Sequence, residues 1–139
     1  MQTRFTITTQ GQGLYEFTHR VRTWVDQGQI SQGLLTLFVR HTSCSLLITE
    51  NADPDVILDM RDFYATLVPE NMPGLRHICE GPDDMPAHIK AALSPVSLSI
   101  PVMDGAPALG TWQGLFLFEH RKRTHRREIV AHLQKDDNV

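Results

Sequence analysis

The sequence lacks most of the features that mark a specialised class of protein. Its 139 residues include only two cysteines, Cys44 and Cys79, which form no CxxC pair and are expected to be reduced, partly buried thiols. Apolar runs such as 34–39 are far too short to cross a bilayer, and the first residues have no hydrophobic stretch typical of a secretory signal. The net charge of −3 argues against general nucleic-acid binding. We therefore expect a cytoplasmic protein whose partners include neither membranes nor nucleic acids.

What remains is the composition of an ordinary globular protein, with 41% hydrophobic and 21% charged residues. A chain of 139 residues is close to the commonest size of one domain, and division into two domains would leave each half with a thin core. We predict a single domain over 1–139, with a flexible tail after about residue 134.

Hydrophobic periodicity predicts an α+β fold with a mostly antiparallel sheet and a few helices, because regular βα alternation is absent. A stripe from Leu14 to Val25 indicates a helix that Gly28 ends, and Asp53 with Pro54 begins a second helix. Methionines, phenylalanines and Trp24 are expected in the core, and His19 and His132 on the surface. The strands are predicted at 4–9, 33–40, 45–49, 96–102, 114–119 and 128–133, with 33–40 and 45–49 as an antiparallel pair, and a short helix at 86–93.

A polar cluster lies in the irregular segment 70–86, which is long for an idle loop in a small domain. It contains His77, Asp83, Asp84 and His88, and Gly81 permits a bend that brings the two imidazoles together. Imidazole and carboxylate together suit zinc, manganese or iron. The spacing matches no standard zinc motif, so a polar loop in which one aspartate caps the next helix is the alternative.

Two further polar groups flank the predicted strand 45–49. His41, Thr42 and Ser43 precede it, and they suit either anion binding and acid–base chemistry or a turn satisfied by backbone groups. Glu50 and Asn51 follow it, and they lie near His41 if the two strands form a hairpin. Their alternative role is to provide polarity at the start of the next helix.

The segment 110–114 offers a flat ring and an amide, Trp112 and Gln113, between two glycines that allow close backbone approach. This pair suits a heteroaromatic ligand, although a core tryptophan at the start of a strand is the alternative. Glu119 ends the next strand as either a catalytic carboxylate or the partner of an arginine. The basic stretch 120–127 that follows is either a solvated turn or an anion contact.

These segments together resemble the YjbQ-like family, also called the secondary thiamine-phosphate synthase family, from about Thr3 to Gln134. The resemblance implies a compact α+β domain that assembles as a homotrimer, with a site near the subunit boundaries. It also implies a weak ability to form thiamine phosphate by joining a pyrimidine diphosphate to a thiazole phosphate. The segments that carry it are His41–Ser45, Glu50–Pro54, His77, Glu80–Gly81, Asp83–Ala91, Ile100–Val102 and Gly110–Gly114.

Our hypothesis is an enzyme for a small-molecule substrate, with a divalent metal (zinc, manganese or magnesium) or a phosphate held by the histidines and aspartates. The chain has no phosphate loop of the GxxxxGK type, so side chains or the metal must meet the leaving pyrophosphate. The alternatives are a metal-dependent hydrolase of a small phosphorylated or heterocyclic metabolite, and a non-enzymatic trimer that binds a ligand or metal. The candidates are His41, Glu50 and Glu119 for catalysis (Glu119 as general base or as support), Thr42, Ser43, Asn51, Trp112 and Gln113 for substrate, and His77, Asp83, Asp84 and His88 for metal.

Overall fold

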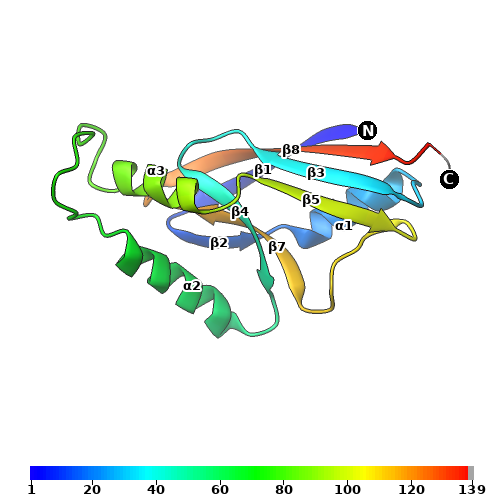
Figure 1. Ribbon diagram of the computed structural model, residues 1–139, viewed down its shortest axis with the longest axis horizontal. Coiled ribbons are helices and arrows are strands. Elements are labelled where there is room, and N and C mark those ends of the chain that lie inside the picture. Colours follow the sequence, from blue (N-terminus) through cyan, green and yellow to red (C-terminus); the bar gives the residue numbers. More distant parts are fainter. Residues whose placement is uncertain (138–139) are drawn as a thin grey trace.

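The computed structural model describes residues 1–137 and arranges them as two antiparallel sheets with three helices around them (Figure 1). The predicted α+β class is confirmed. The strands are β1 (Gln2–Gln10), β2 (Gly13–Glu16), β3 (Gly33–Val39), β4 (Cys44–Glu50), β5 (Ser97–Met103), β6 (Ala106–Pro107), β7 (Gln113–Glu119) and β8 (Thr124–Lys135). The helices are α1 (Thr18–Gln27), α2 (Pro54–Leu67) and α3 (Asp84–Leu93).

A five-stranded sheet has the order β1-β8-β3-β5-β6, and a three-stranded sheet has the order β2-β7-β4. Strand alternation directs one face of each sheet inward, so that Phe5 and Ile7 of β1 are buried while their neighbours are exposed. The core lies between the sheets, where Leu35 and Ile129 of the large sheet join the same cluster as Leu117 of the small one. Cys44 is buried in this cluster and Cys79 is exposed, which corrects the expectation of two partly buried thiols; among residues 1–137 both are free.

The predicted pairing of 33–40 with 45–49 is wrong. β3 lies between β8 and β5 in the large sheet, whereas β4 pairs with β7 in the small sheet. The link 40–43 has none of the Asn-Gly or Gly-rich signals that close a tight hairpin, and it carries the chain from one sheet to the other. Hydrophobic alternation predicts a strand without specifying its partner.

The first helix begins later than its hydrophobic stripe predicts. Leu14 belongs to strand β2, where it pairs with Phe118 of β7, and the helix α1 starts at Thr18. The backbone N–H of Phe17 donates to the carbonyl of Leu115 at 2.9 Å, which holds the chain to the small sheet just before the helix. Gly28 caps the end of α1 as predicted.

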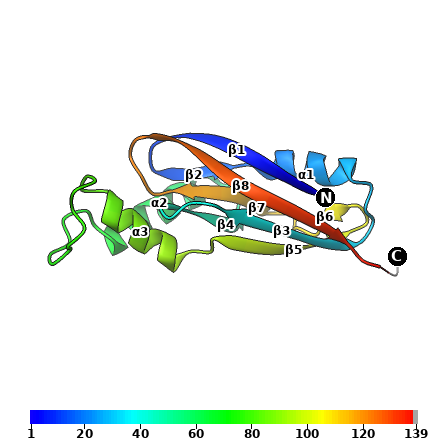
Figure 2. The same ribbon diagram turned by 90° about the horizontal axis from the view of Figure 1, so that it is seen from above.

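Helix α2 begins as predicted, because the side chain of Asp53 accepts a hydrogen bond from the backbone N–H of Asp55 at 2.9 Å. Its apolar stripe, however, is only partly covered: Tyr64 stacks on Phe118 of β7, but within the described residues no α2 residue is fully buried, and Phe63 is 59% exposed. Phe38 and Met103 are also exposed, which corrects the expectation that phenylalanines and methionines lie in the core. Helices α2 and α3 and the loop between them gather at the end opposite the two termini (Figures 1 and 2).

Helix α3 starts at Asp84, two residues earlier than predicted, and β8 continues to Lys135, so the predicted flexible tail begins inside this strand. The rest of that tail includes residues 138–139, which lie outside the described residues. Over residues 1–137, none of the helices has the length and apolarity needed to span a membrane.

Candidate metal centre

Three predicted ligands converge at the start of α3. Asp84 and His88 lie one turn apart on the same helix face, and the loop before the helix brings His77 beside them. Nε2 of His77 is 2.6 Å and Nε2 of His88 is 3.2 Å from Oδ2 of Asp84. One donor atom from each residue lies within 4.8 Å of the others. Gly81, with φ of 100°, occupies the left-handed region in the bend that makes this possible.

The imidazole of His88 has a defined tautomer. Its Nδ1 must donate to the carbonyl of Thr42, 2.9 Å away, because a carbonyl oxygen can only accept. When the ring is neutral, Nε2 presents a lone pair to the carboxylate of Asp84, and two electron-rich atoms at this distance need a cation between them; when the ring is protonated, its own charge faces that carboxylate. Metal-binding histidines in proteins are commonly oriented by a backbone carbonyl in this way.

The carboxylate of Asp84 is nearly buried, and its two oxygens have different partners. One oxygen binds the guanidinium of Arg121, and the other faces the imidazoles of His77 and His88. Burial alone would raise the pKa of Asp84, but the hydrogen bond from His77 and the charges of His88 and Arg121 outweigh it and lower the pKa. The group is therefore an anion, as a carboxylate that binds a metal is.

Asp83, the fourth predicted ligand, does not converge with the other three. Its Oδ2 accepts from Nε of Arg121 at 3.0 Å and from the backbone N–H of Lys122 at 2.9 Å. Burial would raise the pKa of Asp83, and these hydrogen bonds lower it further than burial raises it. Asp83 thus anchors the β7–β8 turn to the start of α3. Neither aspartate caps α3 with its side chain, among the hydrogen bonds of the described residues.

Arg121 is a functional residue that sequence reasoning missed, since it was grouped with the basic stretch 120–127. Its guanidinium contacts both aspartates and also donates to the carbonyl of Glu80 at 3.0 Å. Two adjacent acidic residues that both become buried require a buried cation. The pairing of Asp83-Asp84 with a distant basic turn was the available signal, but the sequence does not say which of its cations is used.

Glu119 lies next to this group and has no exposed surface. Nε and Nη2 of Arg127 donate to its carboxylate at 2.7 and 2.5 Å, and the hydroxyl of Thr9 donates to the same carboxylate at 2.6 Å. Burial would raise the pKa of Glu119, but the hydrogen bonds from Arg127 and Thr9 lower it overall. Of the two predicted roles, a support fits this environment, because a buried and saturated carboxylate has no free lone pair for a substrate proton.

The segment 41–43 surrounds the same ion pair. Nε2 of His41 accepts the backbone N–H of Glu128 at 2.8 Å, and its Nδ1 lies 3.4 Å from Nη1 of Arg127. Partial burial, followed by the charge of Arg127, lowers the pKa of His41, so the ring is neutral near pH 7. Ser43 is buried and accepts from Arg127, and Thr42 touches the metal group only through its backbone carbonyl.

His120 is a second buried group that the sequence did not reveal, because it begins the basic stretch 120–127, which indicates a solvated turn. Nε2 is 2.9 Å from the hydroxyl of Ser45, and both residues are fully buried. Nδ1 is the buried side-chain polar atom that has no partner within residues 1–137. Burial, together with the charges of Lys90 and Arg127, lowers the pKa of His120 to about 3.

The remaining predicted residues lie at the opposite end of the small sheet. In the β4–β7 register Cys44 pairs with Glu119, while Glu50 pairs with Gln113 at the other end. Seven residues of strand separate these pairs by about 20 Å. The structure therefore divides the predicted site, with Glu50, Asn51, Trp112 and Gln113 far from the histidine cluster.

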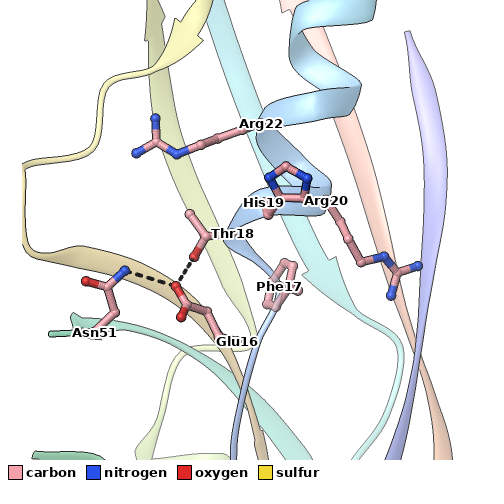
Figure 3. A pocket seen from close by; sticks show the side chains of 7 residues that line it. All are labelled: Glu16, Phe17, Thr18, His19, Arg20, Arg22 and Asn51. Atoms are coloured by element: carbon pink, nitrogen blue, oxygen red, sulfur yellow. Dashed lines mark hydrogen bonds between the residues drawn. The ribbon is translucent and has the colours of Figure 1, made fainter. Parts of the chain in front are cut away.

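A separate pocket of about 370 Å³ opens at this second end (Figure 3). The carboxylate of Glu16 accepts from the hydroxyl of Thr18 at 2.7 Å and from the amide of Asn51 at 3.0 Å, and both bonds are drawn in Figure 3. A Cβ at Gly114 would come within 2.9 Å of the Cβ of Asn51, which cannot move away without its backbone, so a larger residue there would shift the chain. Trp112 lies nearby in sequence and is 62% exposed, which excludes the alternative of a core tryptophan.

A family model described as "UPF0047 protein YjbQ-like" matches residues 3–136. The chain belongs to the YjbQ-like UPF0047 family. A UPF0047 protein of Synechocystis is 52% identical to this YjbQ-like chain over 127 residues, covering 91% of it and 86% of the relative. The YjbQ protein of Escherichia coli O157:H7 is 40% identical over 134 residues, covering 96% of each.

Solved structures of YjbQ-like proteins have the same architecture. An uncharacterised YjbQ/UPF0047 protein of Clostridium acetobutylicum superposes with a TM-score of 0.86 at 30% identity, over 95% of this chain and 99% of that one. A conserved hypothetical protein of Thermus thermophilus gives a TM-score of 0.84 at 34% identity, with coverage of 95% and 99%. The single-chain fold is therefore shared over nearly the whole length of these relatives.

Proposed function

We propose that this YjbQ-like protein is a metal-dependent enzyme acting on a small phosphorylated metabolite. We further propose that it forms thiamine phosphate at the same site as a weak activity, by joining a pyrimidine diphosphate to a thiazole phosphate. The observation that carries the proposal is the convergence of His77, Asp84 and His88 on one point, with an ionised carboxylate facing two ring nitrogens.

The donor set suits some divalent metals better than others. Two imidazoles and one carboxylate match zinc or manganese, whereas magnesium prefers oxygen ligands and retains water. The side chains of His77 and His88 are 44% and 31% exposed, so one side of the group remains open to a substrate. Three protein ligands with an open position are typical of catalytic rather than structural zinc. When bound, the metal would act as a Lewis acid that offsets the charge developing on a leaving phosphate.

The surrounding residues set the direction of each ligand. Arg121 binds one oxygen of Asp84 and leaves the other facing the open side. The carbonyl of Thr42 fixes the ring of His88 with Nε2 directed at the same point. His77 comes from the loop and is the most exposed of the three ligands, so it is the one that can adjust when substrate enters.

We also propose that the protein assembles as a homotrimer, as the family resemblance implies. The apolar face of α2 and the ring of Trp112 are exposed in the single chain, and large exposed apolar groups mark interaction surfaces. A neighbouring copy that covers them could place its Asn51 and Trp112 beside the metal group. Such an arrangement would reunite the two halves of the predicted site across a subunit boundary.

The test is an assay at high protein excess with pyrimidine diphosphate and thiazole phosphate, together with the metal content of each preparation. His88→Ala is compared with His132→Ala, a matched change at an exposed histidine on β8. We expect His88→Ala to lose both metal and product, and His132→Ala to retain both. Equal metal content and equal activity in all three proteins would contradict the proposal.

A parallel panel of phosphate esters and heterocyclic amides separates the alternatives. Faster hydrolysis of one of these, lost in His88→Ala, would identify a metal-dependent hydrolase for which thiamine-phosphate formation is incidental. Tight metal or ligand binding without any turnover would identify a binding protein, and the enzymatic proposal would then be wrong.

A further inference from the structure

A buried ion pair lies next to the candidate metal centre. Among the hydrogen bonds of the described residues, neither member of the pair bonds any of the three candidate ligands. Glu119 and Arg127 are 0% and 4% exposed and are joined by two hydrogen bonds of 2.7 and 2.5 Å. Burying two charges is costly, and apolar residues of similar volume often replace such a pair without loss of stability. The pair therefore calls for a role other than stabilising the fold.

One arm of the pair holds the segment that orients His88. Nη2 of Arg127 donates to the hydroxyl of Ser43 at 2.9 Å and to its carbonyl at 3.2 Å. These bonds fix the turn between β3 and β4. The carbonyl just before Ser43, that of Thr42, accepts the proton on Nδ1 of His88. The guanidinium thereby positions the acceptor that selects the tautomer of His88.

The other arm holds the segment that orients Asp84. Oε2 of Glu119 accepts the backbone N–H groups of His120 and Arg121 at 3.0 and 3.2 Å. These two hydrogen bonds to consecutive backbone amides set the direction in which the chain leaves β7. The side chain of Arg121 then reaches Asp84 and holds one of its oxygens.

We infer that Arg127, acting with Glu119, is a positioning residue for the metal centre. It sets the tautomer of His88 and the orientation of Asp84 from the opposite side of two backbone segments, without contacting the metal. This inference rests on the proposed metal centre and extends it to a residue that the sequence placed only within a basic stretch.

The role of the planar guanidinium of Arg127 can be tested by replacing it with lysine, which carries the same charge on a single nitrogen. Arginine directs Nε and Nη2 to Glu119 while Nη2 also reaches Ser43, whereas lysine has one nitrogen and cannot hold both partners. Arg127→Lys keeps the charge that neutralises Glu119. Ser43→Ala is the milder variant, because it removes one bond to the turn and leaves the ion pair intact. Arg126→Lys is the control, since Arg126 is an exposed neighbour on the same strand.

The experiment measures zinc affinity by competition with a chromophoric chelator, and it measures the His88 tautomer by ¹⁵N NMR of the metal-free protein. We expect Arg127→Lys to lose about 10-fold in zinc affinity, at the lower end of the range for groups that support ligands. We also expect its His88 to change from a ring protonated on Nδ1 to a mixture of tautomers. Ser43→Ala should show a smaller change in the same direction, and Arg126→Lys none.

The outcomes separate the two proposals. Zinc binding by the unchanged protein, with the same affinity and tautomer in Arg127→Lys and Ser43→Ala, would overturn the positioning role and leave the metal centre standing. Absence of zinc binding in the unchanged protein would overturn the metal centre, and the tautomer of His88 would still report whether Arg127 orients it. If Arg127→Lys does not fold, Ser43→Ala decides by the same two measurements.

Discussion

The polar residues at the two ends of the small sheet differ in burial. At the Glu119 end, carboxylates and cations are buried and bonded to one another, and the ligand side chains are fixed by backbone carbonyls and guanidinium groups. At the Gln113 end, Asn51, Trp112 and Gln113 are exposed. Mutually bonded, buried side chains of this kind hold the three candidate metal ligands in place within one chain. At the exposed end, Asn51 bonds Glu16 and Gln113 accepts from the backbone N–H of Gly110, while the ring of Trp112 faces outward.

The largest expected effect is a difference in zinc affinity between variants of two adjacent aspartates, Asp84 and Asp83, near the Glu119 end of the small sheet. Asp84→Asn removes the anionic donor and should weaken zinc binding by roughly 100-fold or more, because nitrogen and oxygen of a neutral amide are poor zinc ligands. Asp83→Asn disturbs only the anchor to Arg121 and Lys122 and should cost about 10-fold or less. Competitive zinc titration of both variants makes the measurement. Equal losses would mean that both aspartates are ligands.

The second prediction concerns the exposed surface. Phe63→Asp places a charge in the uncovered apolar face of α2 and should convert a trimer into monomers in analytical ultracentrifugation. Asp62→Asn, at a neighbouring exposed position on the same helix, should leave the trimer intact. Zinc affinity per chain should be the same in the monomeric variant, since the ligands belong to one chain. A monomeric unchanged protein would contradict the assembly.

A third prediction follows from the depressed pKa of His120, which is about 3 in the folded protein. The unfolded chain takes up this proton near pH 6.5, whereas the folded protein does not until about pH 3. Its contribution to stability is therefore complete above pH 6.5 and falls by about 1.4 kcal/mol per pH unit below it. The total loss is on the order of 5 kcal/mol when the pH reaches the folded value.

Urea unfolding at pH 7, 6 and 5 measures this slope. His120→Gln should remove most of it, because glutamine does not titrate; what remains comes from His41, whose pKa is also lowered, and the exposed His19→Gln should retain the whole slope. The same slope in all three proteins would show that His120 is not the group responsible. The comparison stops at pH 5 because Glu119 and the aspartates, whose pKa values are also lowered, lose their contributions as the pH falls further.

The smallest expected effect lies at the exposed end. Trp112→Ala should change the free energy of unfolding of a single chain by no more than about 0.5 kcal/mol, because the ring is mostly outside the core. It should leave zinc affinity unchanged but weaken binding of the pyrimidine diphosphate to the assembled protein. Calorimetric titration with this ligand makes the measurement. Unchanged ligand binding would remove Trp112 from the proposed site.

Local patterns predicted much of this fold. Alternation of buried and exposed residues predicted the long strand β1, and the Asp53-Pro54 pair predicted the start of α2. The bend at Gly81 and the polar residues around it also pointed to the cluster of His77 and His88. Each of these features depends on neighbours within about a dozen residues, which a single sequence contains.

Features that depend on distant partners could not be predicted. β3 and β4 belong to different sheets, although each has the pattern of a strand. Asp83 and Asp84 are adjacent and chemically identical, and Arg121 bonds both. Only the folded chain turns Asp84 toward the two imidazoles and Asp83 toward the backbone N–H of Lys122. The stripe of α2 indicates a covered face, but within residues 1–137 only part of it is covered, and Phe63 and Leu67 stay exposed.

The most direct test of the metal centre is anomalous X-ray scattering from crystals soaked with zinc. We expect one strong peak per chain at about 2.0–2.2 Å from Nε2 of His77, Nε2 of His88 and Oδ2 of Asp84, with Arg121 still bound to the other carboxylate oxygen. A peak elsewhere, or an Asp84 carboxylate that remains hydrogen-bonded to both rings with no metal beside it, would contradict the account.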